Sequence, residues 1–278
     1  MPYQSPIDLH AHSTASDGEL SPTELVQLAA KNGVKTLALT DHDSVSGLAE
    51  ARTAAAEHDI TLINGIELST HWDNKTIHIV GLNINADNTT MIDSTIHLNQ
   101  LREERAINIG KKLAKVGIKG AYENAKELAG DGTVTRQHFA HFLINNGNAK
   151  SFSDVFKRYL VKGKPGYVSV NWPDLSETIE NIHSAGGVAV IAHPLCYKMT
   201  ATKLRKFITE FKTLGGQAIE VVNGNNNMKE ITTVTNYAKR YDIAASLGSD
   251  YHNDKSPWSK LGNLTALPQD LTPVWELF

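Results

Sequence analysis

The chain has 278 residues, 41% of them hydrophobic, which suits one α/β barrel or one domain carrying an insertion. With a net charge of −3 the chain has no overall basic field of the kind that indicates nucleic-acid binding, although a local metal cluster can still attract a small anionic substrate. A single cysteine, Cys196, excludes an internal disulfide. Because no signal peptide or membrane-spanning apolar run is recognisable, we expect a cytoplasmic protein.

Short apolar runs alternate with helical patterns along most of the chain, which is typical of βα units around a parallel sheet. Seven runs are predicted strands, at residues 7–9, 36–39, 61–66, 77–82, 188–192, 218–222 and 243–247. A helix is predicted after Ser21, which serves as N-cap, with Pro22 at the first helical position. Further helices are predicted at residues 46–58, 176–185, 203–214 and 228–241.

Between residues 88 and 168 the alternation stops. Four helical segments follow one another there, at residues 97–118, 121–130, 135–147 and 151–163. We therefore predict a helical insertion at 88–168, forming a cap over the active site of a barrel made of residues 1–87 and 169–278. Seven strands in βα order indicate an α/β fold of the TIM-like (β/α)7 type, one strand short of the usual eight.

Active sites of such barrels lie at the carboxyl ends of the strands. Six of the seven predicted strands deliver an imidazole or a carboxylate to this rim. These residues are His10, His12, Asp17, His42, Glu67, His78, His193, Asp250 and His252. The sixth strand ends in Asn223, which we expect to line the same cavity, while Glu220 within it is expected to be an ordinary barrel residue. A lone histidine at a strand end is usually structural, and the other six histidines are expected to be of that kind.

For the nine residues at the rim, a purely structural explanation fails. Six imidazoles and three carboxylates placed together would lose solvation and repel one another unless cations neutralised them. Nine ligands are too many for one ion. Nitrogen and oxygen ligands without a thiolate suit manganese, iron or zinc, and ions about 3.5–4 Å apart can share a carboxylate and activate a water. The sequence therefore predicts a multinuclear metal centre.

Six motifs, DLHAHSTASDG, LTDHD, GIELS, HIVGLN, IAHP and GSDYH, together resemble the polymerase and histidinol phosphatase (PHP) family of metal-dependent phosphoesterases. The resemblance extends in family order from residue 8 to residue 252. It implies a distorted seven-stranded barrel and three divalent ions, most often Mn²⁺, with Zn²⁺ or Fe²⁺ as alternatives. By motif, the three ions would be held by His10, His12, Glu67 and Asp250; by a bridging Glu67 with His78 and His193; and by Asp17, His42 and His252. Many relatives have histidine in place of Asp17, and a carboxylate there makes the third site harder and less suited to zinc.

The insertion, with TRQHFA and the KGKPGYV loop, resembles the subgroup of nucleoside 3′,5′-bisphosphate phosphatases that includes ribonuclease AM. This implies removal of the 3′ phosphate to leave a nucleoside 5′-phosphate and, in some members, 5′-to-3′ trimming of short RNA. An activated water would attack without a covalent enzyme intermediate, and His193 or His252 would stabilise the developing charge. Asp43 is a candidate acid for the leaving oxygen, and a role in positioning a ligand or the substrate fits equally well.

A second phosphate needs cations of its own. Arg136 follows Thr135, a predicted N-cap, at a helix start whose N–H groups also favour anions. Lys164 lies in the tight loop GKPG, from which a cation could reach the substrate. For both residues, a solvated surface role is equally compatible with the sequence. Tyr167 is a candidate for stacking on a base or ribose, with packing as its alternative.

Three other functions remain open from the sequence. A histidinol-phosphate phosphatase would use the same metals on a single phosphate. A proofreading exonuclease of a DNA polymerase is disfavoured because the chain carries no polymerase and no basic groove. A non-catalytic metal-binding accessory module is disfavoured because no ligand position is lost. The expected partner is a small nucleotide or short RNA, with no duplex nucleic acid and no membrane, and the expected state is a monomer.

Overall fold

The computed structural model describes residues 5–224, 226–254 and 259–278, and the chain forms two compact units. Unit 1 comprises Met1–Thr95 and Pro173–Phe278, and unit 2 comprises Ile96–Trp172. The insertion predicted at 88–168 starts earlier than unit 2 does. This difference arises because helix α3 (Thr89–Ala114) begins in unit 1 and continues into unit 2.

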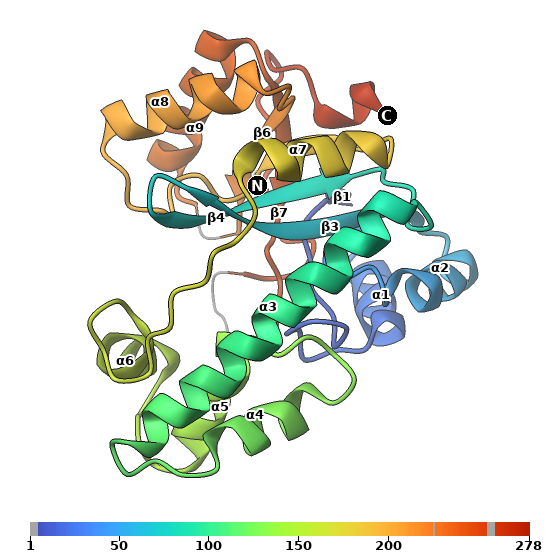
Figure 1. The fold of residues 1–278 in the computed structure, drawn as a ribbon. Coiled ribbons are helices and arrows are strands. Elements are labelled where there is room, and N and C mark those ends of the chain that lie inside the picture. Colours follow the sequence, from blue (N-terminus) through green and yellow to red (C-terminus); the bar gives the residue numbers. More distant parts are fainter. Residues whose placement is uncertain (1–4, 225, 255–258) are drawn as a thin grey trace. The chain divides into compact units, whose positions relative to one another are not determined.

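Unit 1 contains one seven-stranded sheet, whose strands are hydrogen-bonded in chain order (Figure 1). They are β1 (Ile7–Asp8), β2 (Thr36–Leu39), β3 (Thr61–Trp72), β4 (Lys75–Leu82), β5 (Val188–Ile191), β6 (Ala218–Asn223) and β7 (Ala244–Gly248). The first and last strands also meet, because Leu9 N donates to the carbonyl oxygen of Leu247 at 3.1 Å. The sheet therefore closes on itself, and the predicted α/β barrel of seven strands is confirmed.

The prediction of a parallel sheet is wrong for β4, which pairs antiparallel with both β3 and β5. Strand β3 does not end at residue 66 but continues to Trp72, where Asp73 and Asn74 turn the chain directly into β4. Both turn residues have left-handed backbone angles, with φ of 46° and 59°, as a two-residue hairpin turn requires. As a result His78, near the start of β4, lies opposite Ser69 and reaches the carboxyl-end rim of the parallel strands.

Five α-helices of unit 1 connect the strands. They are α1 (Pro22–Lys31), α2 (Leu48–Glu57), α7 (Leu175–Ser184), α8 (Ala201–Thr213) and α9 (Met228–Tyr241). Helices α1 and α9 begin with reciprocal caps, Ser21 with Glu24 and Asn227 with Glu230, which satisfy the first backbone N–H groups. The short 3₁₀ helix η2 (Val274–Leu277) follows near the C-terminus. Helix α2 starts at Leu48, two residues after the predicted start.

Unit 2 contains the greater part of α3 together with α4 (Ala121–Ala129), α5 (Arg136–Asn145), α6 (Phe152–Val155) and the π-helix η1 (Phe156–Leu160). All of its residues are described, and none forms a strand. Leu113, Phe139 and Leu143 are fully buried in its own apolar core. Among the helices of the described residues, none combines the length and apolarity that crossing a membrane requires.

Barrel closure depends on a glycine at the end of β7. A Cβ atom added at Gly248 would lie 2.2 Å from the Cβ of His10 and 2.8 Å from its backbone nitrogen. We therefore expect Gly248→Ala to lower the free energy of unfolding by about 1–3 kcal/mol, as overpacked buried sites do. Thermal unfolding measures this, with Ser246→Ala on the same strand as the control. Equal stability of the two variants would contradict the close approach of β7 to β1.

Candidate metal centre

Glu67 lies at the centre of the site, on β3, with its side chain fully buried. Five imidazoles surround its two carboxylate oxygens. Oε1 lies 3.0 Å from His78 Nδ1 and 2.9 Å from His193 Nε2, while Oε2 lies 2.8 Å from His42 Nδ1 and 3.4 Å from both His10 Nε2 and His12 Nε2. These histidines come from four different parts of the barrel. The structure therefore brings them together as predicted from the strand ends.

The segment that follows β2 holds Glu67 in place. Glu67 N donates to the carbonyl oxygen of Asp41 at 3.2 Å, and Asp43 N donates to that of Glu67 at 2.9 Å. The Asp43 carboxylate accepts the backbone N–H of Ser69 at 2.6 Å. These contacts continue the parallel pairing of β2 with β3 and place His42 beside Glu67. Asp43 itself is fully buried.

Three groups of side chains have ligand atoms that lie within 4.8 Å of one another and could hold a metal ion. They are His10, His12 and Glu67; His42, Glu67 and His78; and His12, Asp17, His42 and His252. Asp250 adjoins the first group, because its Oδ1 lies 3.5 Å from His10 Nε2 and 3.3 Å from His12 Nε2. All nine candidate ligands therefore lie in one continuous cluster of unit 1.

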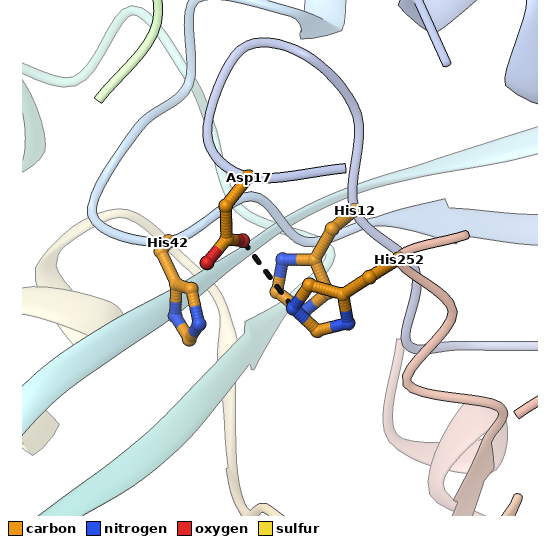
Figure 2. Close-up of side chains that lie close together, drawn as sticks. All are labelled: His12, Asp17, His42 and His252. Carbon is orange, nitrogen blue, oxygen red and sulfur yellow. Dashed lines mark ion pairs between the residues drawn. The ribbon is translucent and has the colours of Figure 1, made fainter. Parts of the chain in front are cut away.

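The third group is formed by the loop after β1 and the segments after β2 and β7 (Figure 2). Asp17 Oδ1 lies 3.3 Å from His252 Nε2, and the His12 and His252 rings stack with centroids 4.1 Å apart. The buried Asp41 carboxylate holds this loop, accepting the backbone N–H and hydroxyl of Ser13 at 2.8 and 2.7 Å and the Ser16 hydroxyl at 2.6 Å. Asp41 thus fixes the loop that carries Asp17.

Several buried polar atoms of the centre make no hydrogen bond with the described residues, although three of them lie within ion-pair distance of a neighbour. They are His12 Nδ1, Asp17 Oδ1, His42 Nδ1, Glu67 Oε2 and His193 Nδ1. Such atoms are costly to bury, and most native proteins satisfy them. A set of imidazole and carboxylate groups with no thiolate is the donor set that divalent Mn, Fe or Zn ions take. The residues present therefore fit bound divalent cations.

The carboxylates of the centre are held in their ionised form. Burial alone would raise the pKa of Glu67, but the imidazoles of His42 and His78 lower it well below its usual range. Burial alone would also raise the pKa of Asp250, but His10, His12 and His252 together lower it well below its usual range. Ionised, buried carboxylates concentrate negative charge at the rim, which favours a cation.

Five imidazoles of the centre have shifted pKa values, which are lowered for His12 and His78 and raised for His10, His193 and His252. Burial lowers the pKa of His12 to about 3 and that of His78 to about 4, so both rings are neutral at pH 7 and can each offer a lone pair. Burial would also lower the pKa of His252, but the Asp17 carboxylate raises it to about 10. Without a metal, His252 is therefore protonated and pairs with Asp17.

Three residues of the site have left-handed backbone angles although none is glycine. Their φ values are 50° for Asp43, 29° for His193 and 54° for Asp250. Such a conformation costs about 1–3 kcal/mol at a residue with a side chain, and it persists where function requires it. Each of the three lies two to four residues beyond the end of a strand. The strain therefore lies where the barrel strands turn their side chains into the centre.

Two aspects of the site differ from the sequence expectations. Glu220 is not an ordinary barrel residue, because its Oε1 lies 2.5 Å from His10 Nδ1 and its Oε2 accepts the backbone N–H of His193 at 2.6 Å. Asp8, which the sequence did not single out, accepts the backbone N–H groups of Ser249 and Gly262 at 2.8 and 2.9 Å. For both residues, the sequence offered one indication of a special role, namely a carboxylate inside an otherwise apolar strand.

The residues predicted to bind substrate lie in both units. Asn223 is buried in unit 1, with its Nδ2 3.4 Å from Glu220 Oε2. In unit 2, Arg136 starts helix α5, and its guanidinium lies 5.4 Å from the ring centroid of Phe156. Lys164 is exposed, and Tyr167 is half-buried and donates its backbone N–H to the carbonyl oxygen of Lys164. Their roles toward a substrate stay predictions.

Comparison with known proteins gives consistent matches over almost the whole chain. A 5′-3′ exoribonuclease from Haemophilus influenzae is 46% identical over 98% of both chains. A 3′,5′-nucleoside bisphosphate phosphatase from Chromobacterium violaceum is 40% identical over 97% of this chain and 95% of its own. The solved structure of an amidohydrolase from Chromobacterium violaceum, with bound sulfate and no metal, superposes with a TM-score of 0.93 at 40% identity, covering 98% of this chain and 96% of its own. The PHP domain matches residues 8–185, so together with the buried cluster of imidazoles and carboxylates these likenesses show that the chain belongs to the PHP family.

Proposed function

We propose that this protein is a metal-dependent phosphoesterase that removes the 3′ phosphate from nucleoside 3′,5′-bisphosphates. The observation that carries the proposal is the cluster of nine imidazole and carboxylate side chains that has the buried Glu67 at its centre. The 40%-identical relative named for this activity supports the choice of substrate. The related structure with bound sulfate adds support, because sulfate resembles phosphate in shape and charge.

The proposal includes three divalent ions, with Mn²⁺ as the physiological metal. His10, His12, Glu67 and Asp250 would hold the first ion, while Glu67 would share the second with His78 and His193. Asp17, His42 and His252 would hold the third, where the carboxylate of Asp17 favours a hard cation such as Mn²⁺. When bound, the ions would activate water for attack on phosphorus and neutralise the phosphoryl charge.

The protein's own groups would bind and orient the phosphate. We assign His193 and His252 to stabilising the charge that develops on the phosphoryl oxygens. Asp43 acts indirectly in this proposal, because its carboxylate holds the backbone of Ser69 and with it the strand of Glu67. Asn223, beside Glu220, is assigned to the edge of the substrate cavity. No side chain is required as a nucleophile.

The second phosphate of the substrate requires cations outside the metal centre. We assign this role to Arg136 and Lys164, and we assign Tyr167 to the base or ribose. Arg136 occupies the first turn of α5, where the backbone N–H groups and the helix dipole also favour an anion. A guanidinium can bind two phosphate oxygens at once, which makes it the stronger candidate of the two cations.

Removal of metal tests the centre directly. The purified protein should carry more than one divalent ion per chain, and a chelator should abolish phosphate release. Among added ions, Mn²⁺ should restore the most activity. Elemental analysis of the purified protein and a phosphate-release assay measure these outcomes, and a stoichiometry of one ion or fewer would contradict the proposal.

Short RNA is a second candidate substrate, because a relative that is 46% identical is named as a 5′-3′ exoribonuclease. A screen of nucleoside 3′,5′-bisphosphates, 5′-phosphorylated short RNA and histidinol phosphate separates the alternatives. Preference for the bisphosphate supports the proposal. Preference for histidinol phosphate would overturn it, and equal use of bisphosphate and RNA would extend it to both.

We also propose that the enzyme is a monomer and that it acts in the cytoplasm. The single cysteine, Cys196, supports a reducing compartment because the chain needs no disulfide for stability. Analytical ultracentrifugation of the metal-loaded protein tests the monomeric state.

A further inference from the structure

Glu220 lies in β6 with 1% of its surface exposed, among strand residues that are all buried. The pairing of β6 with β7 shifts register between Glu220 and Val222, so the strand is irregular at this carboxylate. A carboxylate is almost never fully buried unless it is paired. Its contacts therefore indicate what it does.

Each carboxylate oxygen of Glu220 contacts a different candidate metal ligand. Oε1 lies 2.5 Å from Nδ1 of His10, which follows β1. Oε2 accepts the backbone N–H of His193, which follows β5, at 2.6 Å. The side-chain amide of Asn223 is 3.4 Å from the same Oε2. One side chain on β6 thus connects two residues that lie far apart in the sequence.

The contact with His10 determines which ring nitrogen can face a cation. A carboxylate only accepts hydrogen bonds, so the Nδ1 of His10 must carry the proton that lies between the two groups. The other nitrogen, Nε2, faces Glu67 Oε2 at 3.4 Å and Asp250 Oδ1 at 3.5 Å. In this tautomer Nε2 presents its lone pair to the place where the carboxylates converge.

The contact with His193 acts on the backbone. His193 has a φ of 29°, a conformation that side-chain-bearing residues rarely adopt. By accepting its N–H, Glu220 stabilises this conformation, in which the ring Nε2 lies 2.9 Å from Glu67 Oε1. The same carboxylate thus orients one ligand through its ring and the other through its main chain.

The other buried carboxylates around the centre make a different kind of contact. Asp8 accepts backbone N–H groups from Ser249 and Gly262, and Asp41 holds Ser13 in the loop of Asp17. These contacts fix loops. Glu220 differs because it also contacts an imidazole ring of the cluster itself.

We propose that Glu220 is a positioning residue that presents His10 and His193 together to the divalent ions of the centre. This inference rests on the metal centre of the proposed function. Its role is distinct from that of a ligand, because both of its oxygens are already engaged by N–H groups of other residues. The two histidines that Glu220 contacts belong to the two ion sites that would share Glu67.

Glu220→Gln is the informative variant. A glutamine amide keeps one carbonyl oxygen but replaces the other with an NH₂ donor, so it cannot accept from both His10 and His193. We expect about 10- to 100-fold weaker binding of Mn²⁺ at the sites that these histidines serve, the usual effect of losing such a partner. Electron paramagnetic resonance of free Mn²⁺, recorded while metal-free protein is titrated, gives the number of ions and their affinities without an activity assay.

Glu210→Gln is a matched control. Glu210 also accepts a ring N–H, that of Trp72 at 3.0 Å, but it lies on α8 and contacts none of the nine candidate ligands. It should bind Mn²⁺ as the wild type does. Glu220→Asp keeps the charge but is one methylene shorter, so its Mn²⁺ affinity should fall between those of the wild type and Glu220→Gln.

The outcomes separate the inference from the proposed function. Weaker Mn²⁺ binding by Glu220→Gln, with circular dichroism and thermal unfolding of the metal-free protein close to wild type, supports the positioning role. Wild-type affinity in this variant would overturn it. If Glu220→Gln does not fold, Glu220→Asp decides, and unchanged affinity there would overturn it equally. A wild-type protein that binds no Mn²⁺ would overturn the metal centre itself.

Discussion

Replacing Glu67 with glutamine should reduce kcat for phosphate release at least about a thousandfold, which corresponds to about 4 kcal/mol. The physical reason is the position of its carboxylate, buried and in contact with imidazoles that belong to different candidate ion sites. An amide would remove the negative charge and one of the two oxygen acceptors. Steady-state kinetics with saturating Mn²⁺, together with the number of ions bound, measures the effect.

Asp17→Asn is the matched comparison, because it also changes a buried carboxylate to an amide at the same rim. Asp17 belongs to only one of the three candidate groups, whereas Glu67 belongs to two. The loss of activity should therefore be clearly smaller than for Glu67→Gln. Equal, mild losses at both positions would show that Glu67 does not bridge two ions.

Replacing Arg136 with alanine should lower kcat/KM for a nucleoside 3′,5′-bisphosphate. The expected loss of transition-state stabilisation is about 2–4 kcal/mol, because the second phosphate loses a charged partner. That phosphate does not react, so its binding energy serves to position the reacting one. Hydrolysis of p-nitrophenyl phosphate, which has no second phosphate, should hardly change. The ratio of the two kcat/KM values is the measurement.

Arg136→Lys controls for charge alone. An ammonium cannot make the two parallel contacts of a guanidinium, so this variant should recover only part of the lost kcat/KM. If both substrates slowed equally in Arg136→Ala, the residue would belong to the fold or to the reacting phosphate. The assignment of a bisphosphate substrate would then lose its main physical support.

It could be predicted that the nine candidate metal ligands lie together, because a barrel brings the residues that follow its separate strands to one rim. Residues such as His12, His42 and Asp250 follow separate parallel strands, and the carboxyl ends of those strands meet at one rim. Their residue types then indicate the chemistry. No knowledge of helix positions was needed, because the strands alone place these side chains.

The direction of β4 could not be predicted from its apolar pattern, since parallel and antiparallel buried strands have similar composition. The turn residues Asp73 and Asn74 were a usable signal, because they favour the left-handed angles of a tight hairpin. The carboxylate of Glu220 in an apolar strand was a signal of a special role, but its partners could not be predicted. Its contacts depend on the exact registers of β1, β5 and β6, which local sequence patterns do not determine.

The division of unit 1 into two chain segments affects how the nascent protein assembles. Strands β1 to β4 precede residues 96–172, but β4 obtains its second neighbour only when β5 has been synthesised. Until then one edge of β4 is open to pairing with other chains. Once α3 to α6 have folded around Phe139, the segment between β4 and β5 is no longer a long flexible loop. The entropy cost of joining β4 to β5 is then smaller. Folding of the helical unit before β5 is available should therefore favour closure of the barrel over pairing of the open β4 edge with another chain.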